Sequence, residues 1–262
     1  MTCRVLILAG TNEARNLVAG LVSTPGLEIT VSLAGLVKDA DSYPAVTRRG
    51  GFGGAEGLAR YLMRNRMHLL VDATHPFATR ITANAIAASA KAGIKLLRLE
   101  RPAWTKQAGD NWLESSRMAD LVAGFPPGVT VLAPIGSNAF SYPVAAMIST
   151  RPDLRFVIRV MAEPQAMPSA GNTECILAKP PFSVVAELQT IADYSIDCLL
   201  CRNSGGNAGY AKIVAARRSG IPVHLLSRPE PDHRLPEGSL FTDIESAHSA
   251  IQAELSAVSD RL

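Results

Sequence analysis

The feature that most constrains the fold is a regular alternation of short apolar runs with segments of helical periodicity. In the first half, apolar runs lie at 5–8, 28–33, 69–71 and 95–99, with helix-like segments at 13–22, 57–66 and 76–92. The second half repeats the pattern, with apolar runs at 129–133, 155–160, 175–178, 196–201 and 222–226. Short buried strands separated by helices favour parallel sheets covered by helices. We therefore predict an α/β chain with two Rossmann-like domains and mainly parallel sheets. Two Gly-rich strand-to-helix loops, one in each half, further predict a ligand cleft between the domains.

The length of 262 residues suits two small domains. We place the boundary near residue 115, so that 1–115 form the first domain and 116–262 the second. Hydrophobic residues make up 47% of the chain and charged residues 19%, a composition that supports a packed core. A net charge of +3 is too small for a nucleic-acid binder, and no apolar stretch is long enough to cross a membrane. We expect a cytoplasmic protein, and a monomer because no apolar helical face is left to share.

Two of the four cysteines form a C-x-x-C pair, Cys198 and Cys201, within an apolar run. In a strand, residues three apart point to opposite faces of the sheet, so the two thiols cannot share one metal ion. No second Cys or His pair follows at the spacing of a zinc site. We predict buried free thiols and no metal site.

Several candidate sites follow apolar runs, where ligands of open α/β sheets bind. Gly10 and Thr11 join the first run to a helix, a junction that can hold a phosphate, although only part of the G-x-G-x-x-G fingerprint is present. A plain strand–turn–helix is the alternative. Ser32 and Gly35 end the second run without the Asp or Glu that binds a ribose 2′-hydroxyl, which leaves room for a 2′-phosphate. The stretch Gly50-Gly51-Phe52-Gly53-Gly54 favours a ligand-facing loop.

Three further segments carry chemistry at predicted strand ends. Asp72-Ala73-Thr74-His75-Pro76-Phe77 can cap a helix and supply an imidazole for proton transfer. Arg98-Leu99-Glu100-Arg101 places two guanidinium groups, which bind carboxylates well, beside one carboxylate. Arg202-Asn203-Ser204-Gly205-Gly206 is a second Gly-rich junction, again suited to an anion. A local salt bridge is the simpler explanation for the arginine cluster.

The order of these motifs resembles the precorrin-6A reductase family of cobalamin biosynthesis, from about residue 4 to residue 229. The segments that carry the resemblance are Leu8-Ala9-Gly10-Thr11-x-Glu13-Ala14-Arg15, Val31-Ser32-Leu33-Ala34-Gly35, Gly51-Phe52-Gly53-Gly54, Asp72-Ala73-Thr74-His75-Pro76-Phe77-Ala78, Arg98-Leu99-Glu100-Arg101-Pro102 and Asn203-Ser204-Gly205-Gly206. The resemblance implies an NADPH-dependent oxidoreductase that reduces one CH–CH double bond of precorrin-6A, a polycarboxylate tetrapyrrole, to give precorrin-6B. A noncatalytic NAD(P)-binding sensor is the alternative.

The resemblance also implies roles for individual residues. The cofactor would be held by Gly10, Thr11, Glu13, Ser32, Gly35, Gly53 and Thr74. The substrate would be bound by Arg98, Arg101, Ser204 and Gly205. The reacting centre would be served by His75, Glu100 and Arg202.

Three positions depart from the family pattern. Leu36 stands where many members have Arg, and that Arg could have bound the 2′-phosphate of NADPH. Arg202 stands where many have Lys, so the charge is kept but the residue cannot donate a proton at neutral pH. The stretch Gly136-Ser137-Asn138 replaces an expected Gly-Arg-Gln.

Overall fold

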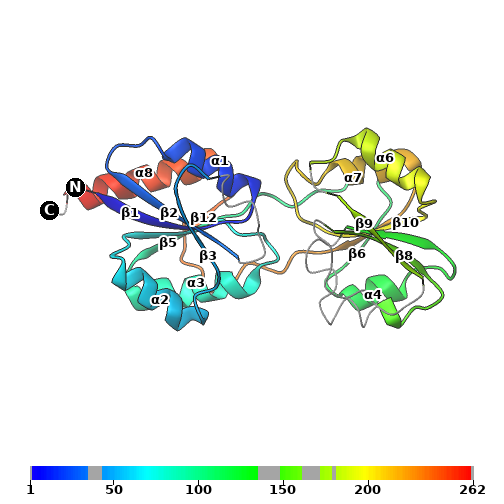
Figure 1. Ribbon diagram of the computed structural model, residues 1–262, viewed down its shortest axis with the longest axis horizontal. Coiled ribbons are helices and arrows are strands. Elements are labelled where there is room, and N and C mark those ends of the chain that lie inside the picture. Colours follow the sequence, from blue (N-terminus) through cyan, green and yellow to red (C-terminus); the bar gives the residue numbers. More distant parts are fainter. Residues whose placement is uncertain (1, 35–42, 135–147, 161–171, 179–180, 261–262) are drawn as a thin grey trace. The chain divides into compact units, whose positions relative to one another are not determined.

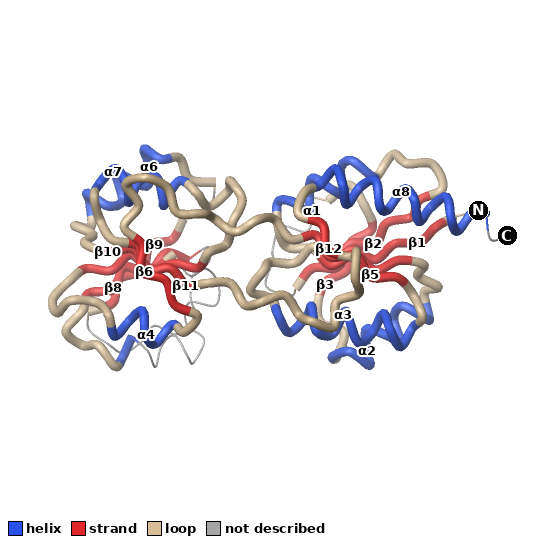
Figure 2. The backbone as a smooth tube through the Cα atoms, turned by 180° about the vertical axis from the view of Figure 1, so that it is seen from behind, coloured by secondary structure: helices blue, strands red, loops and turns tan. Residues whose placement is uncertain are grey.

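The computed structural model of the protein describes residues 2–34, 43–134, 148–160, 172–178 and 181–260. Gly35, Leu36 and the stretch 136–138 lie outside these ranges. The chain forms two compact units, one from Met1–Pro102 together with Pro229–Leu262 and the other from Ala103–Arg228. Each unit is built around a six-stranded parallel sheet with helices on both faces (Figure 1 and Figure 2). The predicted α/β class and the two mainly parallel sheets are confirmed, and the ligand cleft between the halves stays a prediction.

The first sheet has the strand order β12-β5-β4-β1-β2-β3, and every neighbouring pair is parallel. Its strands are β1 (Cys3–Leu8), β2 (Leu27–Leu33), β3 (Val46–Arg49), β4 (Leu69–Asp72), β5 (Lys95–Leu99) and β12 (Leu240–Phe241). Its helices are α1 (Asn12–Leu21), α2 (Gly54–Arg64), α3 (Thr79–Ala92) and α8 (Ile244–Asp260). The helices α1 and α8 cover one face of this sheet, and α2 and α3 cover the other (Figure 1). From β3 to β12 this is the 3-2-1-4-5-6 order of Rossmann sheets.

Burial on both faces explains why β1 reads as a continuous apolar run. Val5 and Ile7 pack in the core under α1 and α8, whereas Leu6 and Leu8 pack in the core under α2 and α3. Alternate residues of a strand point to opposite faces, so a central strand covered on both sides has no position left for a polar side chain.

The second sheet has the order β6-β11-β10-β7-β8-β9, again with parallel pairs throughout. Its strands are β6 (Trp112–Ser115), β7 (Thr130–Ala133), β8 (Arg155–Val160), β9 (Thr173–Leu177), β10 (Cys198–Arg202) and β11 (Val223–Leu226). Its helices are α4 (Met118–Ala123), α6 (Val184–Asp193) and α7 (Ala211–Ser219). Strands β9-β8-β7-β10-β11 repeat the 3-2-1-4-5 order of the first sheet.

The two cysteines of the C-x-x-C pair are buried free thiols, as predicted. Cys198 belongs to the core on the α4 side of the second sheet and Cys201 to the core on the opposite side. Burial raises the pKa of each thiol to about 11. Both are therefore protonated at neutral pH, and neither acts as a nucleophile there.

The two sheets exchange their sixth strands. The strand that follows β5 along the chain joins the second sheet, and the strand that follows β11 joins the first. β6 follows β5 along the chain but pairs with β11, and β12 follows β11 but pairs with β5. The predicted boundary at residue 115 is therefore wrong. Leu240 and Phe241 pair with Arg98 and Leu99, and α8 buries Ile251 in the core beside α1, so residues 229–262 belong to the first unit.

No helix among the described residues combines the length and the apolar character that crossing a bilayer requires.

We expect Ile251→Ala to destabilise the first unit by about 2–4 kcal/mol, because it leaves a cavity in a closely packed core. Amide hydrogen exchange locates the effect: amides of β1 and α1 should exchange faster, while those of β7 and β10 keep their wild-type rates. Gln252→Ala, at the exposed neighbouring position, is the matched control and should change neither set. Faster exchange in β7 and β10 instead would place α8 with the second unit.

Candidate active site

Each sheet has a switch point, where the strand order reverses. Polar side chains lie beside each of these points. In the first sheet the switch point lies between β1 and β4, and in the second between β7 and β10. Ligands of open parallel sheets bind beyond the carboxyl ends of the strands at such a point. β1 and β4 lead into the predicted residues Gly10 and Thr74, and β10 ends at Arg202.

Gly10 and Thr11 form a turn that leaves open space in front of α1. Gly10 has a φ of +141°, and a Cβ there would meet no atom of the described residues within 4 Å. The Thr11 hydroxyl accepts a hydrogen bond from the Ala14 amide at 3.0 Å and donates one to the Ala73 carbonyl at 2.9 Å. It therefore caps the helix and ties it to the end of β4. Among the described residues nothing accepts from the amides of Asn12 and Glu13, which suits an anion.

Glu13 and Arg101 form an ion pair that joins the first turn of α1 to the segment after β5. The sequence predicted separate ligands for them, cofactor for Glu13 and substrate for Arg101. Both side chains are partly buried, at 21% and 15% exposure, so the pair is better protected from solvent than a surface ion pair.

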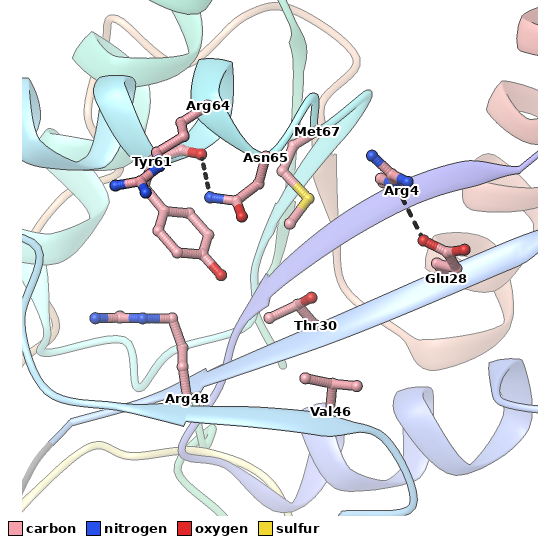
Figure 3. A pocket seen from close by; sticks show the side chains of 9 residues that line it. All are labelled: Arg4, Glu28, Thr30, Val46, Arg48, Tyr61, Arg64, Asn65 and Met67. Atoms are coloured by element: carbon pink, nitrogen blue, oxygen red, sulfur yellow. Dashed lines mark hydrogen bonds and ion pairs between the residues drawn. The ribbon is translucent and has the colours of Figure 1, made fainter.

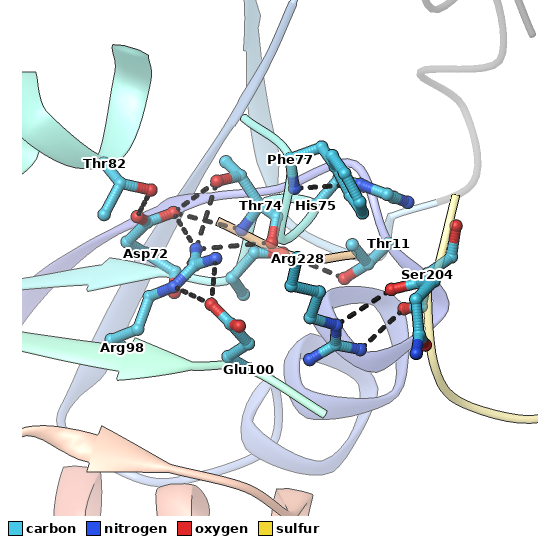
Figure 4. Close-up of polar contacts among 12 residues, drawn as sticks. Thr11, Asp72, Thr74, His75, Phe77, Thr82, Arg98, Glu100, Ser204 and Arg228 are labelled. Atoms are coloured by element: carbon cyan, nitrogen blue, oxygen red, sulfur yellow. Dashed lines mark hydrogen bonds and ion pairs between the residues drawn. The ribbon is translucent and has the colours of Figure 1, made fainter. Parts of the chain in front are cut away.

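The Asp72 carboxylate, at the end of β4, is the centre of a buried polar network (Figure 4). Its Oδ1 accepts hydrogen bonds from the Thr74 hydroxyl at 2.7 Å and the Thr74 amide at 3.1 Å, and its Oδ2 accepts from the Thr82 hydroxyl at 2.7 Å. The Arg98 guanidinium lies 2.9 Å from Oδ1. The carboxylate is fully buried, so these partners replace the water that it loses on folding.

Arg98 is itself an internal residue, with a side chain only 3% exposed. Besides Asp72, its Nη1 donates to the Thr74 hydroxyl at 3.2 Å, and its Nη2 donates to Glu100 at 2.8 Å (Figure 4). Strand alternation places Arg98 and Glu100 on the same side, as the sequence indicated. The guanidinium therefore holds Glu100 and Thr74 in place. The simpler explanation of the arginine cluster, a local salt bridge, is thus met by the pair of Arg98 and Glu100.

His75 follows directly on this network. Its Nδ1 accepts a hydrogen bond from the Phe77 amide at 3.2 Å, and its ring lies against that of Phe77 with centroids 5.8 Å apart. With Nδ1 as the acceptor, the neutral imidazole carries its proton on Nε2.

Ser32, near the end of β2, has a cationic neighbour that sequence reasoning missed. Arg48 on β3 donates to the Ser32 hydroxyl at 2.8 Å and to the carbonyls of Gly50 and Gly51 at 3.0 and 3.2 Å. Its guanidinium stacks 3.8 Å above the Phe52 ring. Arg48 thus pins the Gly-rich loop beside β2. No sequence spacing signals this, because the contact depends on the parallel register that places Ser32 opposite Arg48.

The Gly-rich loop needs its glycines for backbone reasons. Gly50 and Gly53 have φ angles of +97° and +79°, and a Cβ on either would meet open space. A Cβ on Gly57 would lie 1.6 Å from the Phe52 carbonyl oxygen, so the loop packs tightly against the start of α2.

A hollow of about 380 Å³ lies beside β2 and β3, on the side covered by α2 (Figure 3). Arg4 and Glu28, near the amino ends of the neighbouring strands β1 and β2, form an ion pair at 3.0 Å at one end of it, and Arg48 and Tyr61 border it at the other (Figure 3). Ligands of parallel sheets bind at the carboxyl edge, so only the end of the hollow at Arg48 lies near the candidate site, and we assign its Arg4–Glu28 end no part in it.

In the second unit, Trp104 and Asn203 frame the loop that follows β10. The Asn203 side chain accepts from the Trp104 amide at 2.8 Å and donates to the Trp104 carbonyl at 3.0 Å, and the indole donates to the Gly206 carbonyl at 2.8 Å. Gly205 and Gly206 both have positive φ, at +65° and +66°. The Trp104 indole therefore supports this loop.

Arg228, the last residue of the second unit, also holds this loop (Figure 4). Its Nε donates to the Asn203 carbonyl and its Nη2 to the Ser204 carbonyl, both at 2.9 Å. Arg202 precedes the loop, and burial lowers the pKa of its guanidinium, which still stays charged at neutral pH. Arg228 thus fixes the loop that contains Ser204, directly after Arg202.

Sequence reasoning found the strand-end loops but gave no role to several residues that build them. These are Asp72 and Asn203, which stand within its motifs, and Thr82, Arg48, Trp104 and Arg228. Asp72 offered a signal, since a carboxylate ending an apolar run needs partners. The others depend on long-range pairing. Among the described residues no group of three His, Cys, Asp or Glu side chains is placed to hold a metal ion.

Comparisons with known proteins agree on one family. A family model described as precorrin-6x reductase CbiJ/CobK matches residues 4–252. The precorrin-6A reductase of Rhodococcus erythropolis is 41% identical over 86% of this chain and 89% of that protein. That of Mycobacterium tuberculosis H37Rv is 34% identical over 94% and 95%. A solved structure of CobK precorrin-6A reductase has a TM-score of 0.87 and 33% identity, with 97% of each chain covered.

Removing Arg98 should destabilise the first unit strongly. We expect Arg98→Met to lower the free energy of unfolding by about 3–5 kcal/mol, because the Asp72 carboxylate would stay buried without its cation. Denaturant unfolding measures the change. Arg4→Met is the matched control: it breaks the exposed pair with Glu28 and should cost about 1 kcal/mol or less. Equal losses in the two variants would show that Arg98 is not the partner on which Asp72 depends.

Proposed function

The chain belongs to the precorrin-6x reductase (CbiJ/CobK) family, and on this premise we propose that it reduces precorrin-6A to precorrin-6B with NADPH in cobalamin biosynthesis. The observation that carries the proposal is the extent of the family match. It runs over residues 4–252 and so includes both units and every candidate site loop, rather than one Rossmann unit alone. Such an enzyme is an oxidoreductase, and its substrate is a tetrapyrrole.

The residues at the first switch point fit a dinucleotide. The open space in front of Gly10 and the unpartnered amides of Asn12 and Glu13 suit the pyrophosphate, as in other Rossmann sheets. Thr11 and the Glu13–Arg101 pair hold the turn in shape. NADPH, when bound there, supplies a hydride to one carbon of the substrate double bond.

We assign selection of NADPH over NADH to Arg48. Position 36 carries Leu and offers no charge for the 2′-phosphate. Arg48 brings a guanidinium to Ser32 at the end of β2, where a ribose-binding Asp or Glu stands in NAD-specific sheets. Its Nε has no partner among the described residues, so a donor is left for a phosphate oxygen. This contact makes up for the Arg absent at position 36.

Reduction also requires a proton on the neighbouring carbon, and His75 and Glu100 are the two candidate donors. His75 carries its proton on Nε2 when neutral, because Nδ1 accepts from the Phe77 amide. Glu100 is oriented by Arg98 and remains 21% exposed. We propose that Arg98 acts by positioning Glu100 and Thr74 rather than by touching the substrate, and that Arg101 positions Glu13.

The loop after β10 is the part of the second unit that we assign to the substrate. Arg202 supplies a positive charge for a carboxylate, while Ser204 and Gly205 offer a hydroxyl and a backbone without a Cβ. Arg228 and Trp104 fix this loop from two sides, which favours recognition with little loss of conformational entropy.

The direct test is an anaerobic assay with precorrin-6A. We expect NADPH oxidation, followed by the loss of the reduced cofactor's own absorbance, only when the tetrapyrrole is supplied. Mass spectrometry should show a product heavier by two hydrogens. Cofactor binding without consumption would instead support a noncatalytic NAD(P)-binding sensor and would contradict the proposal.

The cofactor assignment has its own test in Arg48→Gln. We expect the KM for NADPH to rise about tenfold and the KM for NADH to stay within about twofold, because one charge-assisted contact to the 2′-phosphate is lost. Arg49→Gln removes the same charge from the next residue, which points to the opposite face of β3. If Arg49→Gln raises the NADPH KM and Arg48→Gln does not, the assignment to Arg48 is wrong.

A further inference from the structure

A group of ionisable side chains lies on the α6 and α7 side of the second sheet, near the carboxyl ends of its strands. Arg159 comes from the end of β8 and Cys201 from the end of β10. Glu187 lies in the first turn of α6 and Lys212 in the first turn of α7. This is the edge of the sheet at which ligands of parallel sheets bind, next to the loop after β10.

Arg159 is paired but not fully satisfied. Its Nη2 donates to Glu187 at 2.7 Å, with the two side chains 5% and 3% exposed, and its guanidinium lies 4.1 Å from the Phe182 ring. Among the described residues, its Nε is buried without a hydrogen-bond partner. Buried donors are nearly always satisfied in folded proteins, and such exceptions concentrate at functional sites.

Lys212 has no carboxylate partner among the described residues. Its Nζ donates to the Gly209 carbonyl at 2.7 Å and lies 5.3 Å from the centre of the Trp104 ring. An ammonium group has three donors, so two remain for a ligand. A Cβ on Gly209 would lie 2.9 Å from Nζ, so the ammonium group packs closely against the Gly209 backbone.

The charge balance around Lys212 is positive. Burial is the main cause that lowers the pKa of Lys212, and the charges of Arg159 and Arg202 lower it further, while Glu187 raises it. Cys201 contributes no negative charge at neutral pH, since its own pKa is about 11. Within the part of the chain that the structure describes, Glu187 is thus the one carboxylate among these residues, and it is bound to Arg159.

The helix dipole adds to this imbalance. Lys212 is the second residue of α7, where the partial charge of the helix is positive and a cation is unfavourable. A cation held at a helix N-terminus, half-buried and beside further cations, lowers stability unless an anion is present. A bound carboxylate would satisfy the free donors and neutralise the charge.

We propose that Lys212, supported by Arg159, binds a carboxylate side chain of the tetrapyrrole substrate. This assignment rests on the proposed function, and it adds to the loop after β10 a second contact that comes from α7. The ammonium group sits next to the Gly205–Gly206 loop through its bond to Gly209, so one substrate carboxylate at Lys212 would orient the macrocycle over that loop.

The experiment compares the wild-type protein with the Lys212→Met variant. Both are measured in steady-state kinetics and in equilibrium titration with precorrin-6A. We expect the KM and the Kd for precorrin-6A to rise about tenfold or more, as for loss of one charge-assisted hydrogen bond. The KM for NADPH should stay within about twofold, because a merely structural defect would affect both ligands. Lys212→Arg should recover most of the tetrapyrrole affinity, since it keeps the charge.

Controls separate folding from binding. Lys95→Met removes the same charge at the amino end of β5, away from the site edge, and should leave both KM values unchanged. Thermal unfolding verifies that each variant is folded, and Lys212→Gln replaces Lys212→Met if the latter fails to fold.

Two results overturn the inference: an unchanged affinity for precorrin-6A in the neutral variants, or a rise in the NADPH KM without a rise for the tetrapyrrole. The proposed function fails separately, if the wild-type protein does not oxidise NADPH with precorrin-6A. In that case the titration alone still decides whether Lys212 binds the tetrapyrrole.

Discussion

The buried carboxylate of Asp72 is the constraint around which the candidate site is organised. It stands at the end of a central strand, where it has no access to water, so every one of its lone pairs needs a partner from the chain. Those partners come from the following turn, from α3 and from β5, through Thr74, Thr82 and Arg98. Because Arg98 also binds Glu100, the charge on one strand end determines where the carboxylate on the next one lies. The burial of Asp72 thus fixes the geometry of the loops on which a cofactor and a substrate would depend.

The exchanged sixth strands make each sheet depend on a segment that lies far away in the sequence. β5 and β11 would each be the edge of a sheet if the chain simply completed one unit before starting the next. Instead β12 covers β5 and β6 covers β11, which satisfies the backbone groups of both strands. The first unit is therefore complete only when the C-terminal residues have been added. Pairing between segments so distant in sequence is slow to form, because the closure entropy of a long loop must be overcome first.

Arginine shows how residue type and residue role differ. Arg98 and Arg101 were predicted to bind substrate because guanidinium groups suit a polycarboxylate, yet both are bound to carboxylates of their own unit. Arg48 and Arg228 carried no motif and turned out to support candidate loops. Lys212 belongs to none of the motifs, and its interest comes from its neighbours on β8, β10 and α6. A sequence motif identifies which side chains can bind an anion, but their partners decide which of them remain available.

The amino-acid sequence by itself determined the α/β class, the parallel sheets, the buried thiols of Cys198 and Cys201 and the positions of the strand-end loops. It could do so because apolar periodicity, turn glycines and motif order are local properties of the chain. Only the tertiary structure decided the division into units, the exchange of β6 and β12, the Asp72–Arg98–Glu100 network and the contact between Arg48 and Ser32. Each of these depends on which distant strands lie side by side. That choice is made by the burial and hydrogen bonding of whole sheets, and no short stretch of sequence contains it.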